Sequence, residues 1–176
     1  MKKKNLFIGL SVLIVLIGLP LILQQSWMLL PEKKETTQKL TSLINNANII
    51  DEKEEISLQH AFVDSIRIIF RFPPNTCSCL ELDFAKAVNR AKKDIGENNV
   101  FVIIAGETTK DIIFFRERTK LSGHIYSTTD TIITSFDTGQ EPYACVAFPD
   151  MTAKNIVSVD PKNILELIDY AKKNIR

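Results

Sequence analysis

The sequence predicts an α/β domain that follows an N-terminal membrane segment. Residues 56–176 alternate between short apolar runs rich in β-branched and aromatic residues, which predict strands, and apolar residues at helical spacing, which predict helices. Residues 6–23 carry no charge. Two cysteines, Cys77 and Cys79, fall where the first clear strand gives way to the first clear helix.

The first strand and helix of the domain are the most strongly patterned. Ile66 to Phe72 is rich in β-branched and aromatic residues and predicts a strand. The helix predicted from about Cys79 to Ile95 ends at Gly96, a favourable C-cap residue. Its apolar residues recur on one face: Leu80, Phe84, Val88, Ala91 and Ile95.

The later elements follow the same alternation. The predicted strands are 100–104, 143–148 and 156–159, and the predicted helices are 108–118 and 163–176, with a less regular, strand-like stretch over 123–136. A strand, a crossover helix and a second strand make a parallel pair, whereas the short final strands suit a hairpin. The fold class is therefore an α/β sandwich with a central mixed sheet.

The N-terminal apolar stretch has the length and the flanking charges of a membrane anchor. As a helix, residues 6–23 would span about 27 Å, close to the hydrocarbon thickness of a bilayer. Lys2, Lys3 and Lys4 flank it on one side only, which predicts a cytoplasmic N-terminus and an extracytoplasmic, periplasmic domain. A cleaved signal peptide is the alternative, and it is disfavoured because no alanine precedes Ala47 to provide an Ala-x-Ala site.

A polar segment, residues 31–55, connects the apolar stretch to the domain. Its apolar residues Leu40, Leu43, Ile44 and Ala47 recur at helical spacing and predict a short amphipathic helix within 31–50. The predicted organisation is a signal-anchor segment over 1–30, an amphipathic linker over 31–55 and the α/β domain over 56–176.

The charge of the chain argues against nucleic acid as a partner. Its 176 residues hold 22 basic and 21 acidic side chains, and setting Lys2, Lys3 and Lys4 aside leaves 19 basic residues against the same 21 acids. A domain this close to neutral lacks the basic surface that nucleic-acid binding needs.

Cys77 and Cys79 are candidates for a redox-active pair. A helix N-terminus presents unpaired N–H groups and positive potential, which favour a thiolate over a thiol. Cys77 would attack as the thiolate, and Cys79 would resolve the mixed disulfide. Because a one-residue spacer closes a tight ring, donating or isomerising a disulfide is favoured over stable reduction.

Two other interpretations of the cysteines stay open. In one, the pair is vestigial or structural, and the domain is a catalytically silent binding or assembly module of the cell envelope. In the other, Cys77 and Cys79 join Cys145 in a site for a soft metal such as copper(I) or zinc. We assign no metal and no cofactor, since His60 and His124 have no spacing relation to the cysteines and a lone strand cysteine is usually a small buried residue.

The order of elements, with cysteines at the first strand-to-helix turn, resembles the thioredoxin-like superfamily. More narrowly, it is similar to the membrane-tethered thioredoxins and the peroxiredoxin-related proteins. The resemblance covers Ser65 to Arg176. It rests on the strand–Cys–helix segment 70–81, on 141–146, which is similar to the family's cis-proline loop, and on 146–159, which is similar to its closing hairpin. The family motif is Cys-x-x-Cys, whereas this chain has Cys77-Ser78-Cys79.

The resemblance implies a fold, an activity and a set of site residues. The fold would be a thioredoxin-like sandwich, and the activity would be thiol–disulfide exchange with exported proteins or with a redox partner protein. Catalytic roles would fall to Cys77 and Cys79. Substrate contacts would fall to Thr76, Pro142 and Tyr143, with Pro142 forming the wall on the substrate side. Both the cis and the trans form of the bond before Pro142 stay open.

Overall fold

The computed structural model of the protein describes residues 41–51, 54–61, 65–74 and 76–175. The predicted membrane anchor and the first part of the predicted linker lie outside the described residues. Among the helices that are described, none is long and apolar enough to cross a membrane.

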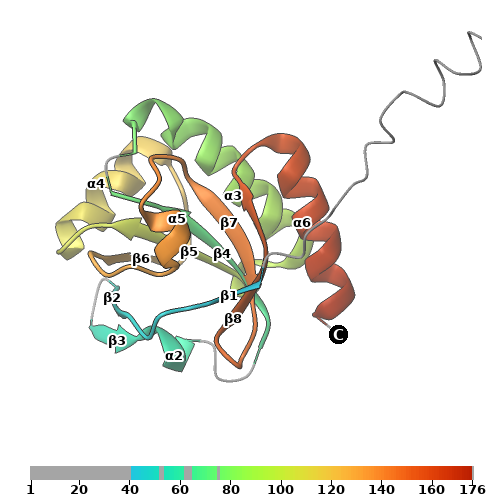
Figure 1. Cartoon of the computed structure of the whole chain (residues 1–176). Helices are drawn as coiled ribbons and strands as arrows, with labels where there is room; N and C mark the ends of the chain where they lie inside the picture. The colour runs from blue at the N-terminus through green and yellow to red at the C-terminus, as the bar shows by residue number, and fades with distance from the viewer. Residues whose placement is uncertain (1–40, 52–53, 62–64, 75, 176) are drawn as a thin grey trace, which may run out of the picture. The chain divides into compact units, whose positions relative to one another are not determined.

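The described residues form one mixed β-sheet (Figure 1). Across the sheet, its eight strands are β1 (Thr41–Leu43), β8 (Thr152–Ser158), β7 (Tyr143–Ala147), β4 (Arg67–Phe72), β5 (Val100–Ala105), β6 (Ile125–Thr128), β2 (Asn48–Ile50) and β3 (Glu55–Ser57). The neighbours β4, β5 and β6 are parallel, and the remaining neighbouring pairs are antiparallel. The mixed sheet and the parallel pair formed by β4 and β5 confirm the prediction from the sequence.

Between the strands, and after the last one, the chain forms helices and 3₁₀ turns. They are α2 (Leu58–Ala61), the 3₁₀ turn η1 (Ser78–Leu80), α3 (Glu81–Ile95), the 3₁₀ turn η2 (Glu97–Asn99), α4 (Thr109–Thr119), α5 (Thr134–Asp137) and α6 (Pro161–Asn174). The three long helices, α3, α4 and α6, contribute to one apolar core on one face of the sheet. The opposite face packs against the shorter α2 and α5 and the chain between β1 and β2.

Strand β5 shows why the apolar runs of the sequence are continuous rather than alternating. Val100, Val102 and Ile104 belong to the core beneath the long helices, whereas Phe101 and Ile103 belong to the core on the other face. Successive side chains of a strand point to opposite faces, so a central strand covered on both sides needs apolar residues at every position.

The predicted amphipathic helix over 31–50 is wrong for the residues that are described. Residues 41–43 form β1, which pairs with β8, and residues 48–50 form β2, which pairs with β3 and with β6 at Ile50 and Ser127. Ile44 and Ala47, which gave part of the helical spacing, are instead buried in the core on one face of the sheet, together with Ile49. Pairing with strands far along the chain decides the structure of this weakly patterned segment.

Candidate functional site

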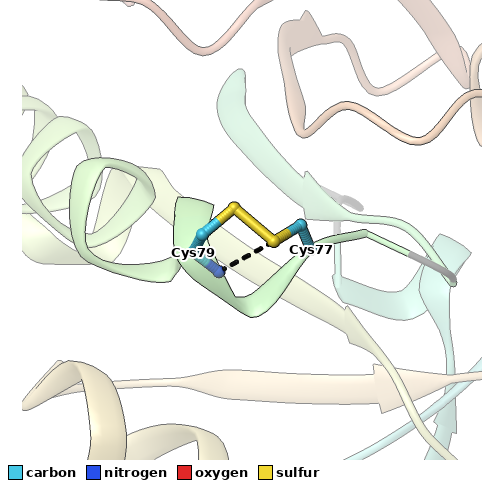
Figure 2. Close-up of a disulfide and its surroundings, with 2 residues drawn as sticks. All are labelled: Cys77 and Cys79. Carbon is cyan, nitrogen blue, oxygen red and sulfur yellow. Dashed lines mark hydrogen bonds between the residues drawn. A yellow bond between two sulfur atoms is a disulfide. The ribbon is translucent and has the colours of Figure 1, made fainter.

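The two cysteines lie at the carboxyl end of the central strand β4. Pro73 and Pro74 follow the strand directly, and proline cannot donate to a sheet, so β4 ends at Phe72. We call residues 73–80 the cysteine loop. Cys77 and Cys79 form a disulfide in it, with 5.2 Å between their Cα atoms (Figure 2). This confirms the predicted position of the cysteines between strand and helix.

The disulfide is open to solvent and held by the backbone of the helix start. Cys77, Ser78 and Cys79 are all exposed. Cys77 caps the 3₁₀ turn η1, since the backbone N–H of Cys79 donates to Cys77 Sγ at 3.2 Å (Figure 2). The backbone N–H of Leu80 donates to the Cys77 carbonyl at 3.0 Å. The sulfur of Cys77 therefore already receives a hydrogen bond, as a thiolate at that position would need.

Thr76, a predicted substrate contact, stabilises the cysteine loop from within. Its hydroxyl donates to the carbonyl of Pro73 at 2.9 Å, and its side chain is half-buried. This bond closes the loop just before Cys77 and fixes the direction in which the chain enters the disulfide.

An ion pair anchors the start of α3 behind the disulfide. Glu81 lies two residues after Cys79, and its buried carboxylate accepts from Arg118 Nε at 2.8 Å and from Arg118 Nη2 at 2.9 Å. These hydrogen bonds raise the pKa of Arg118. The pair joins the start of α3 to α4 directly after the cysteine loop.

Pro142 and Tyr143 come to the same edge of the sheet as the cysteine loop. Tyr143 pairs with Arg71, the next-to-last residue of β4, which puts the start of β7 beside the end of β4. The sequence left the cis or trans state of Pro142 open, and the Glu141–Pro142 bond is trans, the geometry that X–Pro bonds intrinsically prefer. The Pro142 carbonyl accepts from the backbone N–H of Val159 at 3.1 Å.

A buried network of charged and polar side chains, which the sequence did not predict, stabilises this end of the sheet. Arg71 is fully buried, and its Nε donates to Asp137 Oδ1 at 3.1 Å. The Tyr143 hydroxyl donates to the same oxygen at 3.1 Å. Burial and the nearby Asp137 raise the pKa of Tyr143. The side chain of Tyr143, a predicted substrate contact, is therefore buried and bonded inside the protein.

Arg71 also reaches two backbone carbonyls, those of Ile104 at 2.9 Å and Asp130 at 3.3 Å. Asp137 in turn accepts from the backbone N–H groups of Ile132 and Ile133. The network thus joins the ends of β4 and β5 to the segment that carries α5. One sequence signal could have pointed to it: an arginine inside an apolar central strand needs a buried acid.

Cys145 is not part of this site. It lies within β7 opposite Ile69 and is fully buried, and burial raises its pKa to about 12. Within the part of the chain that the structure describes, no group of three or more His, Cys, Asp or Glu side chains is placed to hold a metal ion.

Comparison with known proteins shows which solved structures share this fold. No protein-family model matches the chain, and no curated protein matches its sequence. Solved structures do match, and three of them illustrate the likeness. One is BsSco, a member of the Sco family of cytochrome c oxidase assembly proteins in which a disulfide switch was identified. It matches with a TM-score of 0.57 at 11% identity, over 77% of this chain and 94% of that one.

The other two structures are similarly distant in sequence. A Chlorobium tepidum protein provisionally named thiol:disulfide interchange protein DsbE gives a TM-score of 0.56 at 10% identity, over 74% of this chain and 94% of that one. Peroxidoxin BcpB from Mycobacterium tuberculosis gives 0.56 at 11% identity, over 78% of this chain and 98% of that one. At these identities the likeness shows the fold alone: the chain has the thioredoxin-like fold that the resemblance implies.

Proposed function

We propose that this protein of thioredoxin-like fold is a membrane-anchored, extracytoplasmic thiol–disulfide oxidoreductase whose redox centre is Cys77 and Cys79. The observation that carries the proposal is the disulfide just before α3, exposed to solvent after the end of the central strand β4. Exposed disulfides are the labile, exchangeable ones, whereas structural disulfides resist reduction. Solved structures of the same fold include the Chlorobium tepidum protein provisionally named as a thiol:disulfide interchange protein, which supports the same class of chemistry.

The proposed reaction transfers a disulfide to a partner. A partner thiolate attacks Cys77 Sγ, the Cys77–Cys79 bond breaks, and Cys79 leaves as a thiolate. A second partner thiolate then attacks the partner's own sulfur in the mixed disulfide and releases Cys77 as a thiolate. The partner thereby loses two electrons and two protons and becomes a disulfide, while Cys77 and Cys79 become a dithiol. The reverse sequence would reduce a partner disulfide.

The geometry favours Cys77 as the sulfur that exchanges. The backbone N–H of Cys79 donates to Cys77 Sγ, and the same bond would stabilise a thiolate there once the disulfide is open. Cys77 also caps η1, the turn that leads into the N-terminus of α3, where the positive end of the helix dipole favours negative charge.

The location and the partners are part of the proposal. Residues 6–23 would anchor the chain, with Lys2, Lys3 and Lys4 on the cytoplasmic side and the domain outside the cytoplasm. The partners would then be thiols or disulfides of exported proteins, or a second redox protein on the same side of the membrane. Oxidising compartments of this kind are where protein disulfides persist.

The test is oxidative refolding of reduced, unfolded ribonuclease by stoichiometric full chain in detergent. We expect ribonuclease activity to return with the oxidised wild type and to stay at background with Cys77→Ser plus Cys79→Ser. Cys145→Ala is the matched control and should behave like the wild type, because Cys145 is buried away from the disulfide. Equal recovery with the double variant would refute the oxidoreductase and favour a binding or assembly module.

A further inference from the structure

A small cavity lies between the cysteine loop and α4. Its volume is about 270 Å³. Residues on both sides of the redox motif line it, since Thr76 directly precedes Cys77 and Glu81 follows Cys79 by two residues. The rest of its wall comes mainly from the prolines of the cysteine loop and from α4, including Pro74, Asp111, Phe114 and Arg118.

The back of the cavity is formed by packed aromatic rings. Phe72 and Phe115 line it and are buried, with 5.4 Å between their ring centroids. Each ring also contacts Phe84 edge-on, at 5.2 Å and 6.0 Å. Phe114 stands at the cavity on the exposed surface of α4 and is 56% exposed. An apolar group bound here would cover that ring and gain burial for both partners.

The charged groups of the cavity are already paired. Both oxygens of Glu81 accept from Arg118, and Asp111 Oδ2 accepts from the backbone N–H groups of Glu107 and Thr108 and from the Thr108 hydroxyl. The cavity is also smaller than the roughly 300–1,000 Å³ that small-molecule and cofactor sites occupy. The cavity therefore has the size of a single side chain, and its aromatic back wall together with Phe114 suits an apolar one.

Arg118 has one nitrogen, Nη1, that can donate hydrogen bonds to the backbone on either side of such an apolar side chain. Its Nε and Nη2 are held by Glu81, while Nη1 makes no hydrogen bond within the part of the chain that the structure describes. The Arg118 side chain is 54% exposed. Nη1 can therefore donate to a backbone carbonyl of an extended segment that lies along α4.

We propose that this cavity binds an apolar side chain next to the reacting cysteine of the partner polypeptide, and so selects partners by sequence. The inference rests on the proposed disulfide exchange, because a partner thiolate that reaches Cys77 brings its neighbouring residues to this cavity. Phe114 and the aromatic back wall bind the side chain, and Arg118 orients the backbone.

The test compares two single-cysteine peptides, Gly-Leu-Cys-Leu-Gly and Gly-Ser-Cys-Ser-Gly. The rate of mixed-disulfide formation with the oxidised full chain is divided by each peptide's rate with a small model disulfide, which removes differences in thiol reactivity. We expect the leucine peptide to react about tenfold faster, the discrimination typical of one side chain in an apolar pocket. Phe114→Ala should reduce this preference to about twofold or less.

Ile113→Ala is the matched control. Ile113 is the neighbouring exposed apolar residue of α4, at 44% exposed, and it does not line the cavity. This variant should keep the tenfold preference. Equal normalised rates for the two peptides, or an equal loss in both variants, would overturn the cavity's role while leaving disulfide exchange intact. No exchange with either peptide would instead overturn the proposed function, and the cavity's role with it.

Discussion

The buried contact between Arg71 and Asp137 gives the largest stability prediction for this protein. The two side chains are 1% and 4% exposed. Replacing Asp137 by alanine leaves the Arg71 guanidinium buried without its counter-ion and the Tyr143 hydroxyl without its acceptor. Removing one partner of a buried ion pair costs about 3–5 kcal/mol. We therefore expect Asp137→Ala to lower the free energy of unfolding by about 3–5 kcal/mol.

The assay is urea unfolding of the full chain, followed by circular dichroism. Asp137→Asn keeps an oxygen that can accept from Arg71, so its loss should fall between those of wild type and Asp137→Ala. Asp83→Ala is the control, because Asp83 and Lys86 form an exposed pair at 70% and 78% exposed, and such pairs contribute little. A loss for Asp137→Ala no larger than that for Asp83→Ala would refute the stabilising role of the network.

Three further predictions address other parts of the molecule. Burial raises the pKa of Cys145 from 9.0 to about 12, so the unfolded chain ionises there before the folded one and stability falls as pH rises through this interval. The urea midpoint of the wild type should therefore be lower at about pH 10.5 than at about pH 8, and Cys145→Ala should make this difference smaller. An unchanged difference would contradict the burial argument. Arg118→Ala leaves the buried Glu81 carboxylate unpaired and should lower the free energy of unfolding by about 1–2 kcal/mol, with Arg118→Lys intermediate; an unchanged midpoint would contradict this. The full chain should stay with membranes after an alkaline carbonate wash, whereas a variant lacking residues 2–30 should be released; release of the full chain would remove the proposed anchor.

Local patterns were enough to predict the elements that make the core. The continuous apolar run of β5 and the helical spacing of α3 and α6 are signals within about fifteen residues, and each predicted an element that the structure contains. The position of Cys77 and Cys79 between strand and helix followed from the same signals.

The elements that depend on distant partners were not predictable in this way. The strands β1 and β2 exist because they pair with β8 and β6, which lie far along the chain. Taken alone, residues 41–50 carry only weak helical spacing, which led to the wrong prediction of a helix.

The same limit applies to the side chains around the disulfide. Arg71 and Asp137 are 66 residues apart, and Glu81 and Arg118 are 37 apart. No local period links such pairs, so the sequence could indicate only that Arg71, in an apolar strand, needed a partner. The cysteines themselves were predictable because both lie in one turn.

The most direct test of disulfide exchange at Cys77 and Cys79 is the redox equilibrium of the full chain with glutathione. The chain is equilibrated over a series of glutathione ratios, its free thiols are alkylated, and the two forms are counted by mass spectrometry. We predict a reversible dithiol–disulfide couple with a reduction potential above about −300 mV, because exposed disulfides are easier to reduce than structural ones. A pair that stays oxidised below about −300 mV, or that does not interconvert reversibly, would contradict the proposed oxidoreductase.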